Sequence, residues 1–195
     1  MKKIGIYGGT FDPIHLGHLI IAQSFVEQFS LDKCYFVPTK TSPFKTETQS
    51  YFTDEERLKM IELSIDDNPK FDLDTFEVKR TEISYTINTV NHFRHIYPSS
   101  ELYLLIGLDQ AINFGKWKEN SKIRKLAKVV IAQRLSSLED ANKLNEIKKE
   151  FVLLNNPIIG ISSTMIREKI NTKKSIRYLV AEEVWNFIEQ EKYGQ

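Results

Sequence analysis

Short apolar runs alternate with helical segments along most of this chain. The clearest run covers residues 102–106, which are all apolar and are followed by Gly107, a pattern typical of a strand buried on both faces of a sheet. Further strands are expected at residues 2–7, 34–37, 71–75, 129–132 and 151–154, and helices at residues 18–29, 53–65, 86–97, 136–150, 163–170 and 181–191. This alternation predicts an α/β fold built on a doubly wound parallel sheet with right-handed crossovers.

Composition narrows the class of protein further. The 195 residues contain no repeat, low-complexity tract or linker, so we expect a single domain over residues 1–195. The chain carries 27 Lys and Arg against 26 Asp and Glu, a net charge of +1, so neither nucleic acid nor a membrane surface is an expected partner. The lone Cys34, the lack of a signal peptide and the lack of a membrane-spanning run indicate a soluble cytoplasmic protein. The oligomeric state stays open, with a homo-oligomer among the expectations.

The loop between the first strand and the first helix has the character of an anion site. Residues 8–18 read Gly-Gly-Thr-Phe-Asp-Pro-Ile-His-Leu-Gly-His. The paired glycines let backbone N–H groups approach a ligand, and Thr10 adds a hydroxyl. His15 and His18 fall at the entry to the helix, where the helix dipole also favours a polyphosphate. A metal site built on the two histidines and a purely structural glycine turn are the alternatives, while the P-loop and dinucleotide-binding patterns are absent.

A second hydroxyl-rich segment lies near the C-terminal end. Residues 161–167 read Ile-Ser-Ser-Thr-Met-Ile-Arg. Ser162, Ser163 and Thr164 can begin a helix with capping hydroxyls, and Arg167 follows one turn later with a guanidinium suited to phosphate oxygens. Taken alone, such a segment is most often only a helix N-cap.

The two segments together resemble the nucleotidyltransferase superfamily whose hallmark is His-x-Gly-His. Over essentially its whole length the chain resembles the bacterial nicotinate-nucleotide adenylyltransferase family, which implies a Rossmann-like nucleotidyltransferase fold. Ser84, Tyr85 and Thr86 resemble the family's segment for the nicotinate end of the substrate, where hydroxyls and helix N–H groups face a small carboxylate. Read locally, the same residues are an N-cap at Thr86 beside an exposed Tyr85.

Three other stretches also resemble the family, but two of them depart from its pattern at one position each. Gly107, Asp109 and Trp117 resemble the family's Gly-x-Asp and Trp block, although a tryptophan here could equally belong to the core. Lys40 and Lys45 lie in a segment similar to the family's substrate-phosphate loop, but Phe44 stands where the family commonly has histidine. Arg134 resembles the family's arginine near the adenine nucleotide, with Leu135 in place of the usual proline.

The resemblance implies that ATP and nicotinate mononucleotide react to give nicotinate adenine dinucleotide and pyrophosphate, by direct in-line transfer without a covalent intermediate. It places the catalytic role on His18, His15 and Arg167. The ATP-binding residues it implies are Gly8, Gly9, Thr10, Phe11, His15, His18, Gly107, Asp109, Arg134, Ser162, Ser163, Thr164 and Arg167, and the substrate-binding residues are Lys40, Lys45, Ser84, Tyr85, Thr86 and Trp117. Mg²⁺ is expected to arrive with ATP rather than at a fixed protein site. The alternatives are phosphopantetheine adenylyltransferase and a non-catalytic adenine-nucleotide sensor.

Overall fold

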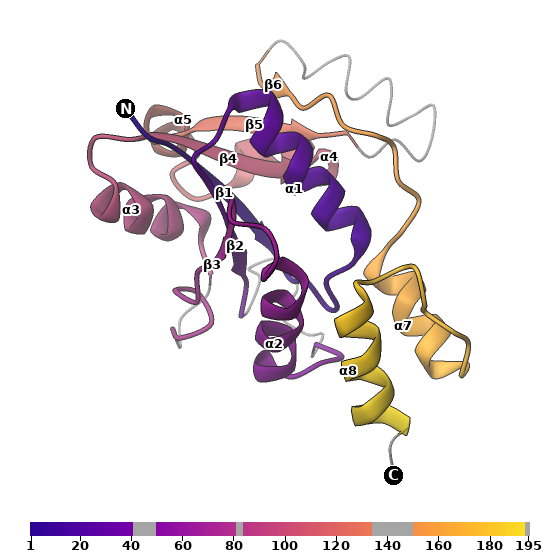
Figure 1. The fold of residues 1–195 in the computed structure, drawn as a ribbon. Helices are drawn as coiled ribbons and strands as arrows, with labels where there is room; N and C mark the ends of the chain where they lie inside the picture. Colours follow the sequence, from indigo (N-terminus) through magenta and orange to yellow (C-terminus); the bar gives the residue numbers. More distant parts are fainter. Residues whose placement is uncertain (41–49, 81–83, 134–149, 194–195) are drawn as a thin grey trace.

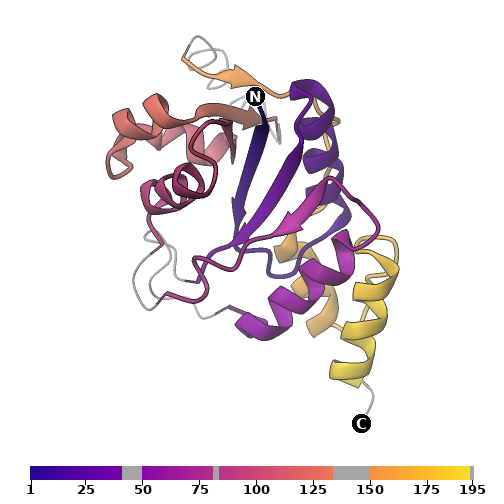
Figure 2. The same cartoon turned by 60° about the vertical axis from the view of Figure 1, so that its left-hand side comes forward.

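The computed structural model describes residues 1–40, 50–80, 84–133 and 150–193. In this part of the chain six parallel strands form one sheet in the order β3-β2-β1-β4-β5-β6 (Figures 1 and 2). The strands are β1 (Lys3–Gly9), β2 (Lys33–Pro38), β3 (Phe71–Leu73), β4 (Glu101–Gly107), β5 (Lys128–Ala132) and β6 (Val152–Leu153). This is the strand order of a doubly wound Rossmann-like sheet, so the predicted fold class is confirmed.

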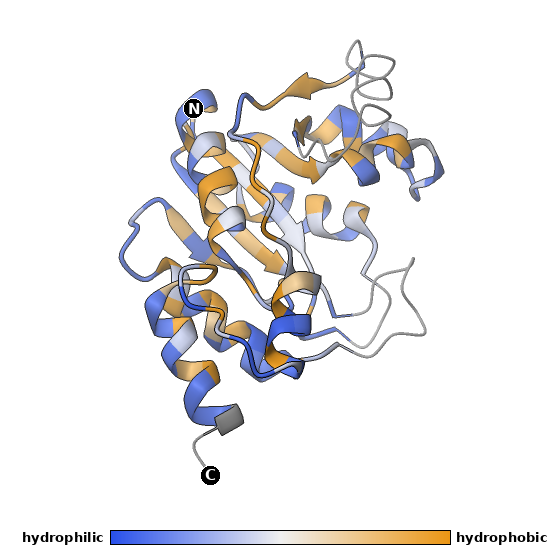
Figure 3. Ribbon diagram, turned by 90° about the vertical axis from the view of Figure 1, so that its right-hand side faces the viewer, coloured by the Kyte–Doolittle hydropathy of each residue, from blue (hydrophilic) through white to orange (hydrophobic). Residues whose placement is uncertain are grey.

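Helices cover both faces of the sheet and enclose two separate apolar cores. On one face the core includes Phe25, Ile61 and Val184. These residues come from α1 (Leu16–Phe29), α2 (Asp54–Ile65) and α8 (Glu182–Tyr193), and α7 (Ser163–Asn171) contributes to the same cluster. On the other face Val90, Ala111 and Ile123 come from α3 (Thr86–Ile96), α4 (Leu108–Ile112) and α5 (Asn120–Leu126). Figure 3 shows that the strands are largely hydrophobic, whereas hydrophobic and hydrophilic residues alternate along the helices.

Most of the expected elements are present at nearly the expected residues. The Thr53–Glu56 capping box is confirmed, since Glu56 N donates to Thr53 Oγ1 at 3.2 Å and Thr53 N donates to Glu56 Oε2 at 2.6 Å. The helix expected from His18 begins earlier, at Leu16, because His15 serves as its N-cap. The third strand is shorter than expected and ends at Leu73.

The sequence analysis missed three short elements after β4. These are α4, the 3₁₀ helix η1 (Phe114–Lys116) and α5, which contain five, three and seven residues. Elements of two turns or fewer do not repeat an apolar position often enough to establish a helical period. The helix expected at residues 136–150 falls almost wholly outside the described residues.

The packing around β1 predicts unequal effects for two of its glycines. A Cβ at Gly5 would lie 2.6 Å from Leu31 Cδ1 and 2.8 Å from Phe25 Cε1, whereas a Cβ at Gly8 would meet nothing within 4 Å. Gly5→Ala should therefore lower the free energy of unfolding by about 1–3 kcal/mol through overpacking. Gly8→Ala, the matched control on the same strand, should change it by no more than about 0.5 kcal/mol. Urea denaturation measures both, and equal stabilities for the two variants would contradict this account of the packing.

Candidate functional site

The first loop runs from the end of β1 to the start of α1 and holds two stacked histidines. His15 is the N-cap of α1 and His18 lies three residues further on, in the first turn. Their rings stack with centroids 3.7 Å apart and planes 22° apart. The backbone N–H of His15 donates to His18 Nδ1 at 3.3 Å.

This hydrogen bond indicates the tautomer of the His18 ring. Because Nδ1 accepts a hydrogen bond, the proton of the neutral ring resides on Nε2. The Nε2–H group is therefore a donor whose orientation is set by the stacking on His15. A donor held in place at a helix N-terminus suits a phosphate oxygen.

Gly8 and Gly9 differ in the space that a side chain would find at each position. A Cβ at Gly9 would lie 2.9 Å from Phe11 Cζ, because the Phe11 ring covers the backbone there. The Phe11 side chain is buried and packs edge-on against His18, with centroids 5.0 Å apart. Gly8, in contrast, leaves its backbone open to an approaching ligand. The Phe11 side chain thus supports His18, and because it is buried only its backbone could contact a ligand.

The C-terminal segment joins the first loop directly. Ser163 Oγ donates to Pro13 O at 2.9 Å, and Arg167 Nη1 donates to Asp12 O at 2.7 Å. These partners are 150 and 155 residues apart in the sequence. The structure therefore brings the two hydroxyl- and histidine-bearing segments together as two walls of one site.

The residues of the C-terminal segment have distinct local roles. Ser162 is the N-cap of α7, and its hydroxyl accepts a hydrogen bond from Met165 N at 3.1 Å. Thr164 is exposed and its hydroxyl accepts from Arg167 Nη2 at 3.2 Å. Arg167 is held on both sides, by Asp12 O and by Thr164, which orients its guanidinium before a ligand arrives.

Asp12 connects several parts of the site, and the sequence analysis assigned it no role. Its buried carboxylate accepts hydrogen bonds from Tyr51 N and Phe52 N, each at 2.9 Å. One of its oxygens also lies 3.8 Å from Arg167 Nη1. The only signal in the sequence was its place inside the first motif.

The loop after β4 faces the same edge of the sheet, because β4 is the neighbour of β1. Gly107 is the N-cap of α4 and its N–H donates to Gln110 Oε1 at 3.1 Å. A Cβ at Gly107 would lie 2.6 Å from Asp109 Oδ1, so glycine allows the Asp109 carboxylate to fold back over the turn. The order of the strands changes direction between β1 and β4, the usual place for a ligand in such sheets.

The start of α3 lies beside the segment that carries Trp117. Tyr85 is the N-cap of α3 and is half-buried, so the alternative of Thr86 as N-cap beside an exposed tyrosine is wrong. Lys118 Nζ lies 4.6 Å from the centroid of the Tyr85 ring, and Trp117 packs on Phe114 with centroids 5.1 Å apart. Lys118, which the sequence analysis did not select, therefore brings a positive charge to the segment expected to meet the acceptor.

The remaining expected residues are less well connected. Lys40 is exposed and comes two residues after the end of β2. Lys45 and Arg134, like Phe44 and Leu135, lie outside the described residues.

A buried acid stands behind the start of α3. Glu77 is only 6% exposed and accepts a hydrogen bond from Thr89 Oγ1. Burial raises the pKa of the Glu77 carboxyl, against the opposite effect of the Thr89 and Ser84 hydroxyls. The raised pKa widens the pH range over which this carboxyl carries no charge beside the start of α3. The burial of Glu77 could not be predicted from the local sequence, because this residue lies in an irregular segment.

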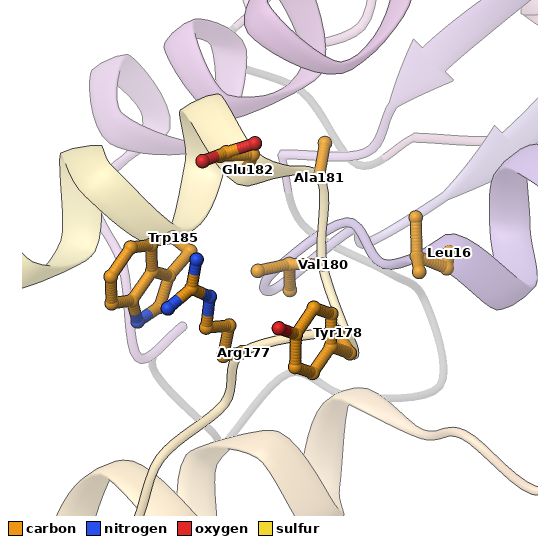
Figure 4. A pocket seen from close by; sticks show the side chains of 7 residues that line it. All are labelled: Leu16, Arg177, Tyr178, Val180, Ala181, Glu182 and Trp185. Carbon is orange, nitrogen blue, oxygen red and sulfur yellow. The ribbon is translucent and has the colours of Figure 1, made fainter.

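A cavity of about 250 Å³ lies between Leu16, the first residue of α1, and the segment that leads into α8 (Figure 4). The Arg177 guanidinium lies 4.8 Å from the centroid of Trp185 and 5.4 Å from that of Tyr178. Leu16 N donates to Leu179 O at 2.9 Å. The start of α1, and with it His18, is thus fixed to the C-terminal helices.

Two searches for other kinds of site or anchor gave negative results. Within the described ranges, no group of three or more His, Cys, Asp or Glu side chains could hold a metal ion. In the same part of the chain no helix has the length and apolar character that crossing a membrane requires.

Fold and site together define a nucleotidyltransferase. The family described as Cytidylyltransferase-like matches residues 6–169, a range that includes both motifs of the site.

Curated relatives narrow the family. A Clostridium tetani protein named "Probable nicotinate-nucleotide adenylyltransferase" is 37% identical over 100% of this chain and 98% of its own length. One of the same name from Caldicellulosiruptor saccharolyticus is 40% identical over 95% of both chains. The chain therefore belongs to the nicotinate-nucleotide adenylyltransferase family, within the Cytidylyltransferase-like proteins.

A solved structure supports the fold. The nicotinic acid mononucleotide adenylyltransferase of Plasmodium falciparum, determined in complex with NaAD, superposes with a TM-score of 0.76. The match covers 99% of this chain and 97% of the other at 20% identity, so the resemblance concerns the fold alone.

The raised pKa of Glu77 predicts a pH-dependent contribution to stability. The folded state retains this proton at pH values where the unfolded state has lost it, so the free energy of unfolding should fall as pH rises from about 4.5 through the raised pKa, and then level off. Glu77→Gln removes that dependence, so the variant should gain stability relative to the wild type over the same window. Urea denaturation of both proteins between pH 4 and 8 measures the difference.

The surface carboxylate Glu101 should contribute a pH dependence of stability with the opposite sign to that of Glu77. The hydrogen bond from Lys128 lowers the pKa of Glu101, so the contribution of this residue is present above about 4.5 and is lost as pH falls. Stability curves of wild type and Glu77→Gln that run parallel over the whole pH range would contradict the assignment of a buried, protonated Glu77.

Proposed function

We propose that this protein transfers the adenylyl group of ATP to nicotinate mononucleotide, giving nicotinate adenine dinucleotide and pyrophosphate in the biosynthesis of NAD. One observation carries the proposal. Ser163 and Arg167 are hydrogen-bonded to the backbone of residues 12 and 13, so the two phosphate-binding motifs line one site. The names of the curated relatives agree with this reaction.

The chemistry requires alignment rather than a strong base. A phosphate oxygen of nicotinate mononucleotide attacks the α-phosphorus of ATP, a new P–O bond forms, and the bond to pyrophosphate breaks with the electron pair leaving on pyrophosphate. A phosphate monoester is already anionic at neutral pH, so no side chain has to remove a proton. The protein must instead hold two anions close together and stabilise the charge that develops on the leaving group.

The donor side is assigned to the first loop and α7. The backbone at Gly8, the Thr10 hydroxyl and the Arg167 guanidinium suit the triphosphate, while the Ser163 hydroxyl joins α7 to the first loop through Pro13 O. His18 Nε2–H is the group we assign to the α-phosphate, with His15 stacked behind it. We further propose that Mg²⁺ enters bound to ATP, as part of the substrate.

The acceptor side is assigned to the neighbouring loops. Lys40 suits the phosphate of nicotinate mononucleotide, and the start of α3 at Ser84 to Thr86 suits its carboxylate. The Trp117 ring offers an apolar surface near the same helix start. The single Cys34 is fully buried and is consistent with a reducing compartment, which supports a cytoplasmic location.

The choice of acceptor is tested with purified protein and ATP. Pyrophosphate release should be fast with nicotinate mononucleotide and should yield the dinucleotide, identified by chromatography. Faster reaction with phosphopantetheine would contradict the proposed acceptor. ATP binding without pyrophosphate release for any acceptor would instead indicate a nucleotide sensor.

Loss of the His18 donor should reduce the rate with the fold intact. His18→Ala should lower kcat by about 10²-fold or more, on the scale of removing one preorganised donor to a developing charge. The control is His95→Ala, an exposed position in the last turn of α3, which should retain wild-type turnover. A near-normal kcat for His18→Ala would remove this residue from the chemistry.

A further inference from the structure

A buried arginine lies beneath the two loops assigned to the two nucleotides. Arg57 comes from the first part of α2. This helix lies near the ends of β1 and β2 (Figures 1 and 2). Its side chain is 0% exposed. Its guanidinium donates to Thr10 O at 2.5 Å, to Thr39 O at 2.9 Å and to Asp54 Oδ1 at 2.7 Å.

The two carbonyl groups belong to different halves of the site. Thr10 follows β1 in the loop assigned to ATP. Thr39 follows β2 and directly precedes Lys40, which is assigned to the acceptor phosphate. One rigid planar group therefore holds one backbone atom of the donor loop and one of the acceptor loop, so the distance between these loops depends on its geometry.

Other contacts make α2 and the chain before it a fixed support for the donor loop. The Asp12 carboxylate binds Tyr51 N and Phe52 N, just before the Thr53 cap of α2. Thr39 N donates to Gly9 O at 2.9 Å, so the two loops are also joined where they leave the sheet. The Arg57 guanidinium binds the carbonyl group of Thr10, the residue that follows Gly9 in the loop assigned to ATP.

Packing alone does not require a guanidinium here. Burying a charged side chain carries a large desolvation penalty, and an apolar side chain of similar volume often gives equal or greater stability. Asp54, whose side chain is partly exposed, balances the charge from one side. What only a forked donor provides is simultaneous attachment to two carbonyl groups that point in from different loops.

We propose that Arg57 is a positioning residue that sets the spacing between ATP and nicotinate mononucleotide for in-line transfer, an inference that rests on the proposed function. Each loop binds its own nucleotide without Arg57. Their alignment, however, is lost when the fork is removed, and a misplacement of about 1 Å can slow a reaction by roughly 10²-fold. The effect should therefore appear in kcat far more than in either KM.

The test compares Arg57→Met and Arg57→Lys with a matched control elsewhere. Arg94 is also a fork on backbone carbonyls, donating to Pro98 O, Ser100 O and Leu126 O at 2.8–3.1 Å, but these lie away from the loops assigned to the nucleotides. Arg57→Met should lower kcat by about 10²-fold and Arg57→Lys by about 10-fold, with both KM values within about threefold of wild type. Arg94→Met should leave kcat of the folded protein unchanged.

Calorimetry adds a readout that does not depend on the chemical step. ATP and nicotinate mononucleotide should each bind Arg57→Met within about threefold of the wild-type Kd. The dinucleotide product, which spans both loops, should bind at least about tenfold more weakly, because its two halves need the correct spacing. Equal losses of affinity for all three nucleotides would overturn the proposal.

The outcomes separate this proposal from the proposed function. A wild-type protein without adenylyltransferase activity would refute the function itself. An active wild type with unchanged kcat in folded Arg57→Met would refute only the positioning role. If Arg57→Met does not fold, Arg57→Lys decides the question, and failure of both to fold would assign Arg57 to stability and overturn the proposal.

Discussion

The site depends on two hydrogen bonds that reach across most of the chain. Ser163 and Arg167 donate to the backbone carbonyls of Pro13 and Asp12, and these bonds join the first loop to the start of α7. The acceptors are backbone atoms, so the bonds depend on the path of the first loop rather than on its side chains. That path is held in turn by Asp12, whose carboxylate binds the chain ahead of α2.

The side chains around the site are hydrogen-bond donors that can stabilise negative charge, and none of them is needed as a strong base. The His18 ring accepts a hydrogen bond from His15 N and stacks on the His15 ring, and Arg167 is held between Asp12 and Thr164. Such preorganised donors favour a transition state in which charge moves toward a leaving pyrophosphate. The start of α3 offers a different environment, with backbone donors, a nearby Lys118 and the buried Glu77, whose pKa is raised by burial.

Much of this arrangement could be predicted from the sequence, and the exceptions share a cause. Apolar runs such as residues 102–106, the Thr53–Glu56 box and the two motifs are local patterns, and each has a physical meaning that survives in the fold. Arg57, Glu77, Asp12 and Lys118 were missed because charged residues are normally solvated, and nothing local shows which of them tertiary packing will bury or pair. Gly9 was selected for its place in the first motif, but its packing against Phe11 could not be predicted, because the position of that ring depends on a left-handed backbone at residue 11.

The pairing of β1 with β2 continues to the last residue of each strand, where Gly9 lies opposite Pro38. Neighbouring strands in a sheet are about 4.8 Å apart, so the two loops begin from a fixed baseline of molecular dimensions. The spacing of β1 and β2 thus sets the distance at which the two loops leave the sheet. A slip of one residue between the two strands would displace one loop relative to the other along the strand direction.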